Sequence, residues 1–434
     1  MDHRKALEYL NQKGNEVQVM HLGTHRTSAI MEALGNPHMK YPSVHIAGTN
    51  GKGSVAAMIE AMLREAGLVT GMYTSPHLVR VEERVRVCGV PLRSELFDLV
   101  TADIRVMEET LLSEGTIDRA LTTFEFLTCC AFLQFAREKV DIAVIEVGLG
   151  GKLDATNVIH PLCSVITSIA FDHQQYLGST IEEIAAEKAG IIKKGVPVIA
   201  GCCNPAAGEV IRHRAETVGT SLLELGRDLV IQNTFMRDGR ATMDLQTPTH
   251  CYTNIELSLA GEFQTRNAAL AVAAVEALES FRIGDTTIYR GLSNARWEGR
   301  LDEYQALRRT LLDGAHNPAA AATLHDYLKQ RNDTEIHMVF GAMRDKNIRE
   351  VAALLFPLAK RVYLAQLSNT RAAQPEDVAN MFPDFHDRIA THSDGETALS
   401  AAWANCPPSG LTLVTGSLYL VGDLLPVVQR YIQK

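Results

Sequence analysis

The sequence lacks the cysteine spacings that mark zinc sites and disulfide scaffolds. Its eight cysteines include no C-x-x-C pair; two pairs are directly adjacent, Cys129–Cys130 and Cys202–Cys203, and the others are isolated. Cysteines without metal-ligand spacing are typical of reduced thiols that pack as small apolar groups in cytosolic proteins. We therefore expect a cytoplasmic protein whose cysteines have no metal-binding role.

The sequence also has no long hydrophobic run. It contains no uninterrupted apolar segment of about 18 residues, which is the length that a membrane-spanning helix needs. The N-terminal segment MDHRKALEYLNQKGNE has no apolar stretch of the kind found in secretory signals. We expect no membrane partner.

The sequence has fewer basic than acidic residues. Lys and Arg number 42 against 51 Asp and Glu, so the formal net charge is -9. A nucleic-acid-binding protein needs a basic face that neutralises phosphates, so we expect no nucleic-acid partner. Small anionic ligands remain compatible with this balance, because they need only a local positive field.

Length and patterning predict a two-domain α/β protein. A chain of 434 residues is too long for one ordinary core. Nearly continuous apolar runs alternate with segments of helical periodicity, as in parallel sheets covered by helices on both faces. The expected strands are Tyr41–Gly48, Leu68–Thr74, Asp141–Val147, Leu162–Ala170 and Val196–Gly201, and the expected helices are Ser54–Ala66, Leu121–Lys139 and Thr180–Gly190.

The alternation is interrupted once and then resumes. Arg227–Leu259 is rich in Thr, Asp and Asn and predicts small antiparallel strands or a flap, and Phe263–Leu278 predicts an Ala-rich helix. A boundary is expected near Ser293–Trp297. Beyond it we expect strands at Thr310–Leu312, Glu335–Phe340, Arg361–Ala365 and Leu411–Val414, and helices at Pro318–Gln330, Ile348–Leu358 and Leu418–Ile432.

The expected fold is therefore a doubly wound, mostly parallel sheet over residues 1–294. A smaller, Rossmann-like α/β domain follows over residues 295–434.

The main chemical signal is HIAGTNGKGS, His45–Ser54, where a strand leads through a glycine turn to a lysine and a hydroxyl residue at a helix start. Such a loop points backbone N–H groups and a helix dipole at phosphates. Lys52 would neutralise phosphate charge and Ser54 could contact a metal. The strict G-x-x-x-x-G-K-[ST] spacing is not met, because Gly53 separates Lys52 from Ser54. The alternative is a glycine turn with a solvated lysine.

Acidic and histidine side chains stand at predicted strand ends. Glu146 closes DIAVIEV, and His173 follows the strand that ends at Ala170. Ligands of open α/β sheets gather outside the carboxyl ends of strands, so both residues are expected to face the phosphate loop. A structural histidine remains the alternative for His173, because magnesium prefers oxygen ligands.

Three further positions are ambiguous from local pattern alone. Lys188 lies in the helical stretch IEEIAAEKAGI and would ordinarily be a solvated side chain. Asp313 precedes the turn GAHNP, which is either a helix start or a strand-end site that includes His316. Ser417 opens the last helix in TGSLYLVG and could hold a carboxylate there.

Together these motifs resemble the folylpolyglutamate synthase and dihydrofolate synthase family, within the Mur ligase superfamily. The matching segments occur in family order and span nearly the whole chain. They are LGNP (Leu34–Pro37), AGTNGKGS, YTSPHL (Tyr73–Leu78), TTFEFLT (Thr122–Thr128), EVGLGGKLDATN (Glu146–Asn157), SIAFDHQQYLG (Ser168–Gly178), EKAGI (Glu187–Ile191), GEFQTRNAALA (Gly261–Ala271), ARWEGRLD (Ala295–Asp302), LLDGAHNP (Leu311–Pro318), VFGAMRDKN (Val339–Asn347) and TGSLYLVG (Thr415–Gly422).

The resemblance implies a P-loop-type ATP-binding domain over residues 1–294 and a C-terminal glutamate ligase domain over residues 295–434. It also implies a role for each matching residue. It places the nucleotide at Gly51, Lys52, Gly53, Ser54, Asn267, Arg300 and Asp313, and magnesium, at two sites, on Ser75, Glu146 and His173. Lys188 matches a lysine that carbon dioxide carbamylates, which overturns its reading as a solvated side chain. The pterin substrate is expected at Phe124, Glu125, Leu153, Asp154 and Ala155, and glutamate at His316 and Ser417. Lys188, Lys52 and His316 are the expected catalytic residues.

Two positions depart from the family pattern. Lys152 stands where the family usually has Arg, so the charge is kept but the bidentate guanidinium is lost. Glu298 replaces a usual Pro, which we expect to loosen the hinge between the domains.

The function implied by the resemblance is ATP-dependent ligation of L-glutamate to dihydropteroate, to the γ-carboxylate of (tetrahydro)folate, or to both, through an acyl phosphate. We expect a bifunctional monomer. One alternative is a Mur-type ligase acting on a UDP-linked cell-wall precursor, but only about 47 residues precede Gly48, which we expect to be too few for a nucleotide-sugar domain. A second alternative is an ATP-binding switch without ligase activity.

Overall fold

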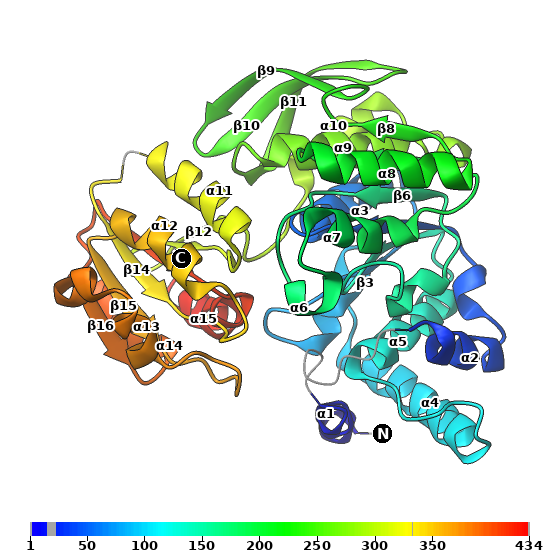
Figure 1. The fold of residues 1–434 in the computed structure, drawn as a ribbon, viewed down its shortest axis with the longest axis horizontal. Coiled ribbons are helices and arrows are strands. Elements are labelled where there is room, and N and C mark those ends of the chain that lie inside the picture. The colour runs from blue at the N-terminus through cyan, green and yellow to red at the C-terminus, as the bar shows by residue number, and fades with distance from the viewer. Residues whose placement is uncertain (1, 15–22, 332, 433–434) are drawn as a thin grey trace.

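Two α/β bodies lie side by side in the computed structural model, which describes residues 2–14, 23–331 and 333–432 (Figure 1). The chain passes from the larger to the smaller body between α10 (Asp285–Asn294) and β12 (Asp302–Gln305). We call the part up to Asn294 the N-terminal lobe and the part from Asp302 the C-terminal lobe. Within the described ranges, no helix is both long and apolar enough to cross a membrane.

The N-terminal lobe is built on an eight-stranded sheet with the order β4-β3-β2-β5-β1-β6-β7-β8. The six strands from β2 to β8 in this order are parallel, and β3 and β4 extend the edge in antiparallel pairing. The strands are β1 Ser43–Ala47, β2 Thr70–Tyr73, β3 Val85–Val87, β4 Val90–Pro91, β5 Ile142–Glu146, β6 Cys163–Ile166, β7 Val198–Ala200 and β8 Leu222–Glu224. The doubly wound, mostly parallel sheet expected from the sequence is confirmed.

Helices cover both faces of this sheet because the central strands are apolar on both sides. In β5, Val144 packs with the helices of one face, whereas Ala143 and Ile145 pack with those of the other. The first face holds α3 Lys52–Glu65, α9 Gln264–Glu276 and α10, and the second holds α1 His3–Gln12, α2 His25–Ala33, α4 Ser94–Ser113 and α5 Thr123–Glu138. Helices α7 Ile181–Lys188 and α8 Pro205–Val218 pack beside β6 and β7, and α6 is the short helix Gln174–Leu177.

The segment expected to form antiparallel strands or a flap is a separate three-stranded antiparallel sheet. Its strands are β9 Val230–Arg237, β10 Arg240–Gln246 and β11 Cys251–Ala260. Alternate residues of β10, such as Met243 and Leu245, are buried against α9, so this sheet caps the N-terminal lobe.

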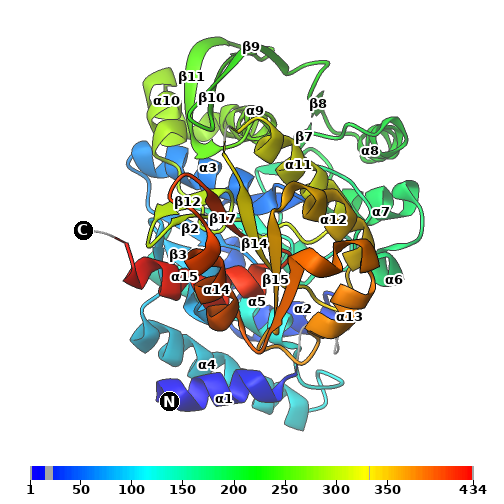
Figure 2. The ribbon, with the colours of Figure 1, turned by 90° about the vertical axis from the view of Figure 1, so that its left-hand side faces the viewer.

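The C-terminal lobe is a six-stranded sheet with the order β12-β13-β17-β14-β15-β16, parallel except for the edge pair β12–β13. Figure 2 shows it facing the viewer, with helices on either side of the central strands. The strands after β12 are β13 Arg309–Leu312, β14 Ile336–Phe340, β15 Arg361–Ala365, β16 Ile389–His392 and β17 Leu411–Thr415. The helices are α11 Pro318–Lys329, α12 Ile348–Leu355, α13 Pro375–Asn380, α14 Gly395–Asn405 and α15 Leu418–Arg430.

One expected strand is shorter than its apolar run. The run Leu162–Ala170 leaves the sheet after Ile166, at the end of β6. The next two residues turn to the phosphate loop, where the hydroxyls of Thr167 and Ser168 donate to the backbone oxygen of Asn50 at 2.7 and 3.0 Å. Side-chain hydrogen bonds to a neighbouring loop therefore end the strand before its apolar character ends.

Candidate active site

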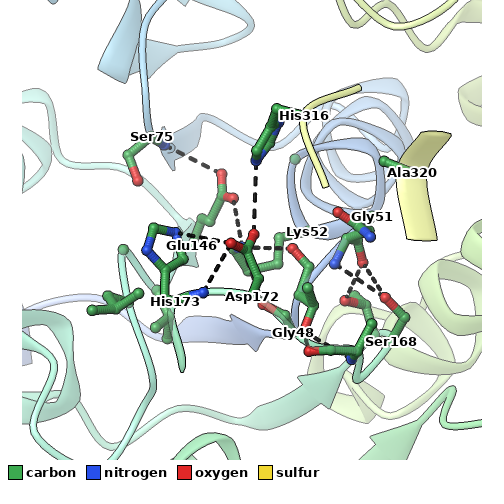
Figure 3. Close-up of a pocket in the computed structure, with 18 of the residues that line it drawn as sticks. Gly48, Gly51, Lys52, Ser75, Glu146, Ser168, Asp172, His173, His316 and Ala320 are labelled. Carbon is green, nitrogen blue, oxygen red and sulfur yellow. Dashed lines mark hydrogen bonds and ion pairs between the residues drawn. The ribbon is translucent and has the colours of Figure 1, made fainter. Parts of the chain in front are cut away.

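A cavity of about 650 Å³ lies between the two lobes, at the carboxyl ends of β1, β2, β5 and β6. Every site residue named from the sequence lines it. This includes residues more than 360 positions apart, from Ser54 to Ser417. Figure 3 shows Lys52, Ser75, Glu146, Asp172, His173 and His316 converging on one space. The geometry brings the predicted set together, while the role of each residue stays a prediction.

The phosphate loop joins β1 to α3. The helix begins at Lys52, two residues earlier than expected, with Gly51 at its N-cap in the left-handed region (φ 90°). Glycine is required for close approach at Gly48, where a Cβ would lie 1.9 Å from Thr167 Oγ1, and at Gly53, where it would lie 2.7 Å from the Trp297 indole. Backbone N–H groups at the start of a 14-residue helix therefore face the cavity, as an anion site needs.

Lys52 and Glu146 face each other across the loop. The Lys52 ammonium donates to the backbone oxygens of Gly48 and Thr49 at 3.1 and 3.3 Å and lies 3.9 Å from Glu146 Oε1. The backbone N–H of Ser75, just after β2, donates to Glu146 Oε2 at 3.3 Å. Burial raises the pKa of Glu146, and the positive charge of Lys52 opposes that rise. The carboxylate is 3% exposed, so a further cation in the cavity would compensate its charge.

Lys188 is a buried cavity residue at the end of α7. Its side chain is 4% exposed, and its ammonium donates to the backbone oxygen of Gly48 at 3.0 Å. Burial, with the nearby charge of Lys52, lowers the pKa of Lys188 to about 7. A lysine with this pKa is substantially neutral at physiological pH. The interpretation of Lys188 as a solvated helix residue is wrong.

Asp172 and Lys346 are cavity residues that the sequence argument did not select. Lys346 of the C-terminal lobe donates to Asp172 Oδ1 at 2.7 Å and lies 3.2 Å from His173 Nε2. Burial by itself would raise the pKa of Asp172, but the charge of Lys346 holds that pKa well below its usual range. Burial, together with Lys346, lowers the pKa of His173 to about 4, so His173 is neutral at pH 7. Asp172 stood beside His173 in the sequence, but nothing there pointed to Lys346 as its partner.

The C-terminal lobe contributes the turn after β13. Asp313 accepts backbone N–H bonds from Leu301 and Ala315 at 3.0 and 2.9 Å. His316 lies 3.8 Å from Asp172 across the lobes, and burial lowers its pKa to about 3. Asn317 caps α11, and its Nδ2 donates to Asn50 of the phosphate loop at 3.0 Å. The turn is both a helix start and a strand-end group, so the two interpretations of GAHNP are compatible.

Ser417 begins α15 as its N-cap, where its hydroxyl accepts from the backbone N–H of Tyr419 at 3.1 Å. Asn267 of α9 donates to Gln264 at 2.8 Å and lies against Gly51. Burial raises the pKa of Asp313 as it does that of Glu146, and Arg300, which follows the hinge segment and lines the cavity, is close enough to oppose both rises.

The residues expected to contact the pterin line one end of the cavity, but their two carboxylates already have protein partners. Glu125 accepts from the guanidinium of Arg26 at 2.8 Å and from the backbone N–H of Thr122 at 2.8 Å. Asp154 accepts from the backbone N–H groups of Gly148 and Leu149 at 3.1 and 3.0 Å. These carboxylates hold the cavity wall in place, which leaves Phe124, Leu153 and Ala155 as apolar contact surface.

The donor set around Glu146 fits a hard divalent cation. Glu146 and the Ser75 hydroxyl offer the oxygen ligands that magnesium prefers. In the part of the chain that the structure describes, no group of three or more His, Cys, Asp and Glu side chains is close enough to bind a metal alone. A magnesium ion here would therefore complete its coordination with nucleotide phosphates, which is its usual habit in nucleotide sites.

Family comparisons agree with this architecture. The family model described as the Mur ligase middle domain matches residues 46–275, and that described as the Mur ligase, glutamate ligase domain matches residues 299–418. The chain is 37% identical to the dihydrofolate synthase/folylpolyglutamate synthase of Bacillus subtilis over 410 residues, covering 93% of this chain and 94% of the relative.

The chain belongs to the folylpolyglutamate synthase and dihydrofolate synthase family of Mur ligases.

Solved structures of this family superpose on this chain over nearly its whole length. Mycobacterium tuberculosis folylpolyglutamate synthase complexed with ADP and AMPPCP matches with a TM-score of 0.91 and 31% identity, covering 100% of both chains. The Escherichia coli homologue in complex with DHPP and ADP matches with a TM-score of 0.88 and 31% identity, covering 99% and 98%. The chain is thus an ATP-dependent ligase of the folylpolyglutamate synthase and dihydrofolate synthase family.

The two departures from the family pattern lie outside the cavity. Lys152 is exposed on the far side of the glycine loop, and its backbone N–H donates to Glu187 at 2.8 Å. Glu298 lies 3.5 Å from Arg86 Nη2, so it pairs the hinge with the N-terminal lobe. The looser hinge that we expect from Glu298 in place of proline stays a prediction.

Proposed function

We propose that this ligase joins L-glutamate both to dihydropteroate and to the γ-carboxylate of (tetrahydro)folate. One observation carries the proposal. The phosphate loop of one lobe and the strand-end groups of the other face a single cavity, large enough for a nucleotide and the ends of two substrates. The names of the relatives cover both acceptors.

The reaction proceeds in two displacements. An oxygen of the acceptor carboxylate attacks the γ-phosphorus of ATP, the bond to the bridging oxygen breaks, and ADP leaves. The amine of glutamate then attacks the acyl phosphate carbon, loses its proton, and expels orthophosphate. A carboxylate alone is a poor electrophile, so this activation is required before an amine can react at neutral pH.

The residues of the phosphate loop bind and orient the nucleotide. Gly51, Gly53 and Ser54 offer backbone N–H groups at the start of α3, and Lys52 spreads the charge of the transferring phosphoryl group. Bound at Ser75, Glu146, His173 and Lys188, two magnesium ions would neutralise phosphate charge during transfer. Asn267, Arg300 and Asp313 complete the nucleotide site, the last two from beyond the hinge.

Lys188 serves this site as a carbamate. Its amine is neutral above about pH 7, which carbamylation by carbon dioxide needs. The reaction joins the neutral nitrogen to the carbon of carbon dioxide and releases one proton, which converts a neutral amine into an anion. An anion at this position would stabilise the cations that a triphosphate brings.

Glutamate is bound by the C-terminal lobe, at His316 and Ser417. We add Lys346 and Arg371 to this subsite. Arg371 lines the cavity, contacts Asp345 at 3.3 Å, and has a buried Nε with no hydrogen-bond partner among the described residues. A carboxylate of glutamate would satisfy that donor, since unpaired buried donors are costly.

The proposal also includes a division into domains 1–294 and 295–434, a monomeric state and a cytoplasmic location. The lobes meet around the cavity, and one chain supplies every proposed site residue.

The direct test is product analysis. Purified protein is incubated with ATP, magnesium and L-glutamate, and with dihydropteroate or tetrahydrofolate, and the products are weighed by mass spectrometry. One added glutamate on each acceptor supports the bifunctional assignment. An ATP-binding switch would instead release phosphate without needing acceptor or glutamate, and that result would contradict the proposal.

A further inference from the structure

The loop between β2 and β3 connects the metal side of the cavity to the opposite lobe. It begins at Ser75, whose backbone N–H donates to Glu146 at 3.3 Å, and three residues later it reaches Leu78. Leu78 contacts Gly422 of α15 in the C-terminal lobe, and neither residue lines the cavity. The loop therefore has one end at the proposed magnesium site and the other at an interface outside it.

Leu78 packs into the C-terminal lobe. Among the apolar residues in the described part of the chain, it is the one from the N-terminal lobe that packs against the apolar cluster of α14 and α15. A Cβ on Gly299 would lie 3.2 Å from Leu78 Cδ1. Figure 1 shows α15 on the side of its lobe that faces this loop.

Gly422 makes this contact a close one. It is a buried residue inside α15, and a Cβ there would lie 2.0 Å from the backbone oxygen of Leu78. Glycine is a poor helix former, so its place in a helix interior calls for a packing reason. The approach of the Leu78 backbone supplies that reason, because alanine would not fit without displacing the loop.

The loop between these ends is held by side-chain hydrogen bonds. The Glu83 carboxylate accepts from the backbone N–H groups of Leu78, Val79 and Arg80 at 2.8, 3.1 and 2.8 Å. The Arg84 guanidinium donates to His77 Nδ1 at 2.9 Å. A segment braced in this way transmits a displacement at Leu78 to Ser75 instead of absorbing it.

Helix α15 carries the link further. Its N-cap, Ser417, lines the cavity, about one and a half turns before Gly422. One rigid helix thus connects Leu78 with the proposed glutamate subsite, and one braced loop connects Leu78 with the proposed magnesium site.

We infer that the contact between Leu78 and Gly422 sets the position of the Ser75 loop relative to α15, which makes Leu78 a positioning residue for ligation. The inference rests on the proposed function. The contact fixes the position of the Ser75 loop, at the proposed magnesium site, relative to the N-terminus of α15, at the proposed glutamate subsite.

The test compares four variants with the wild-type protein. Leu78→Ala removes the side chain, Leu78→Met keeps its volume, and Gly422→Ala inserts a Cβ against the loop. Gly208→Ala is the matched control, since Gly208 is a helical glycine of α8 whose Cβ would meet only the end of Arg212 at 3.4 Å. Leu78→Ala and Gly422→Ala are expected to lower kcat at least tenfold and to raise the magnesium concentration for half-maximal rate. Leu78→Met and Gly208→Ala are expected to stay within about twofold of wild type.

A second readout is independent of turnover. Hydrogen exchange of the amides of Leu78, Val79 and Arg80, without ligands, is expected to be at least tenfold faster in Leu78→Ala than in wild type. A further, double variant that combines Leu78→Ala and Gly422→Ala is expected to be no worse than the poorer single variant, because both substitutions free the same loop from its position on α15. If Gly422→Ala does not fold, the comparison of Leu78→Ala with Leu78→Met tests the positioning role of Leu78.

The inference is overturned if Leu78→Ala keeps the kcat, the magnesium dependence and the amide exchange of wild type. It is also overturned if the effects of the two alanine variants simply add. Failure of the wild-type protein to ligate would instead contradict the proposed function, and the exchange measurement would still decide whether Leu78 holds the loop.

Discussion

At the residue scale, the pairing of the buried Lys188 with the partly buried Lys52 explains why this cavity is suited to ATP. Lys52 and Lys188 both donate to the backbone oxygen of Gly48, and their proximity helps to lower the pKa of Lys188 to about 7. The proximity of the two amines disfavours positive charge on both at once, and it favours a ligand or a modification that brings negative charge. A nucleotide phosphate does so for Lys52, and carbamylation does so for Lys188.

Substitution of Lys188 tests the carbamate. Lys188→Ala is expected to lower the ligation rate by roughly 10²-fold or more, the scale of losing a preorganised charge in a closed site. Added short-chain carboxylates are expected to restore part of the rate by entering the vacated space. Ligation assays with and without acetate or formate provide the measurement.

Lys194→Ala is the control, because Lys194 is exposed and does not line the cavity. Full activity of Lys188→Ala would eliminate the carbamate.

Arg371 gives a second residue-scale prediction. Arg371→Ala is expected to raise the KM for glutamate at least tenfold, about 1.4 kcal/mol, while the KM for ATP changes little. The reason is that the buried Nε of the guanidinium gains a carboxylate partner only when glutamate binds, and the variant loses that bond. Steady-state kinetics with each substrate varied in turn measure the split, and an equal rise in both KM values would remove Arg371 from the glutamate subsite.

At the element scale, α7 delivers Lys188 to the cavity, and its start is fixed by a capping box. Thr180 Oγ1 accepts from the backbone N–H of Glu183 at 3.2 Å, and the Glu183 carboxylate accepts from the backbone N–H of Thr180 at 3.2 Å. This reciprocal pair satisfies donors that the helix start leaves open.

Removing the cap is expected to destabilise α7 locally. Thr180→Ala should cost roughly 1 kcal/mol, which corresponds to about fivefold faster amide exchange within Ile181–Lys188. Thr217→Ala is the control, since the Thr217 hydroxyl bonds within α8 to His213 and caps nothing. Unchanged exchange in α7 after loss of Thr180 would show that tertiary packing alone holds the helix.

Most of the elements were predictable because buried parallel strands are nearly continuous apolar runs. Arg361–Ala365 was placed to the residue, and the sheet of β9, β10 and β11 was recognised by its polar alternation. Short edge strands such as β4 and β12 were missed, because β4 is only two residues long and β12 is almost entirely polar.

The site was predictable only where sequence motifs carried it. Periodicity assigned Lys188 to a solvated helix face, and only the family resemblance placed it in the cavity. Lys346 and Arg371 escaped both arguments, since their proximity to Asp172 or to the cavity arises from the docking of two lobes. Contacts between segments more than 170 residues apart leave no local pattern in a sequence.

At the scale of the whole molecule, the proposed nucleotide site takes residues from both sides of the hinge. Lys52 lies on the first lobe, and Arg300 and Asp313 lie beyond the hinge. Since the acyl phosphate must be kept from water, the closure of the lobes and the chemistry are expected to be coupled.

A nonhydrolysable ATP analogue is therefore expected to stabilise the entire chain. At one hundred times its Kd, it should add about 2.7 kcal/mol and raise the Tm by several degrees. Arg300→Ala should lose most of this shift at the same analogue concentration, whereas Arg290→Ala, on the exposed face of α10, should keep it. Scanning calorimetry makes the comparison, and an undiminished shift in Arg300→Ala would show that the second lobe is not part of the nucleotide site.

The central claim is that the acceptor carboxylate is phosphorylated before glutamate attacks it, and isotope transfer tests this most directly. Dihydropteroate labelled with oxygen-18 in its carboxylate is ligated to glutamate, and the orthophosphate released is analysed by mass spectrometry. The account predicts one labelled oxygen in each phosphate formed with a ligated product. Ligated product accompanied by unlabelled phosphate would contradict it.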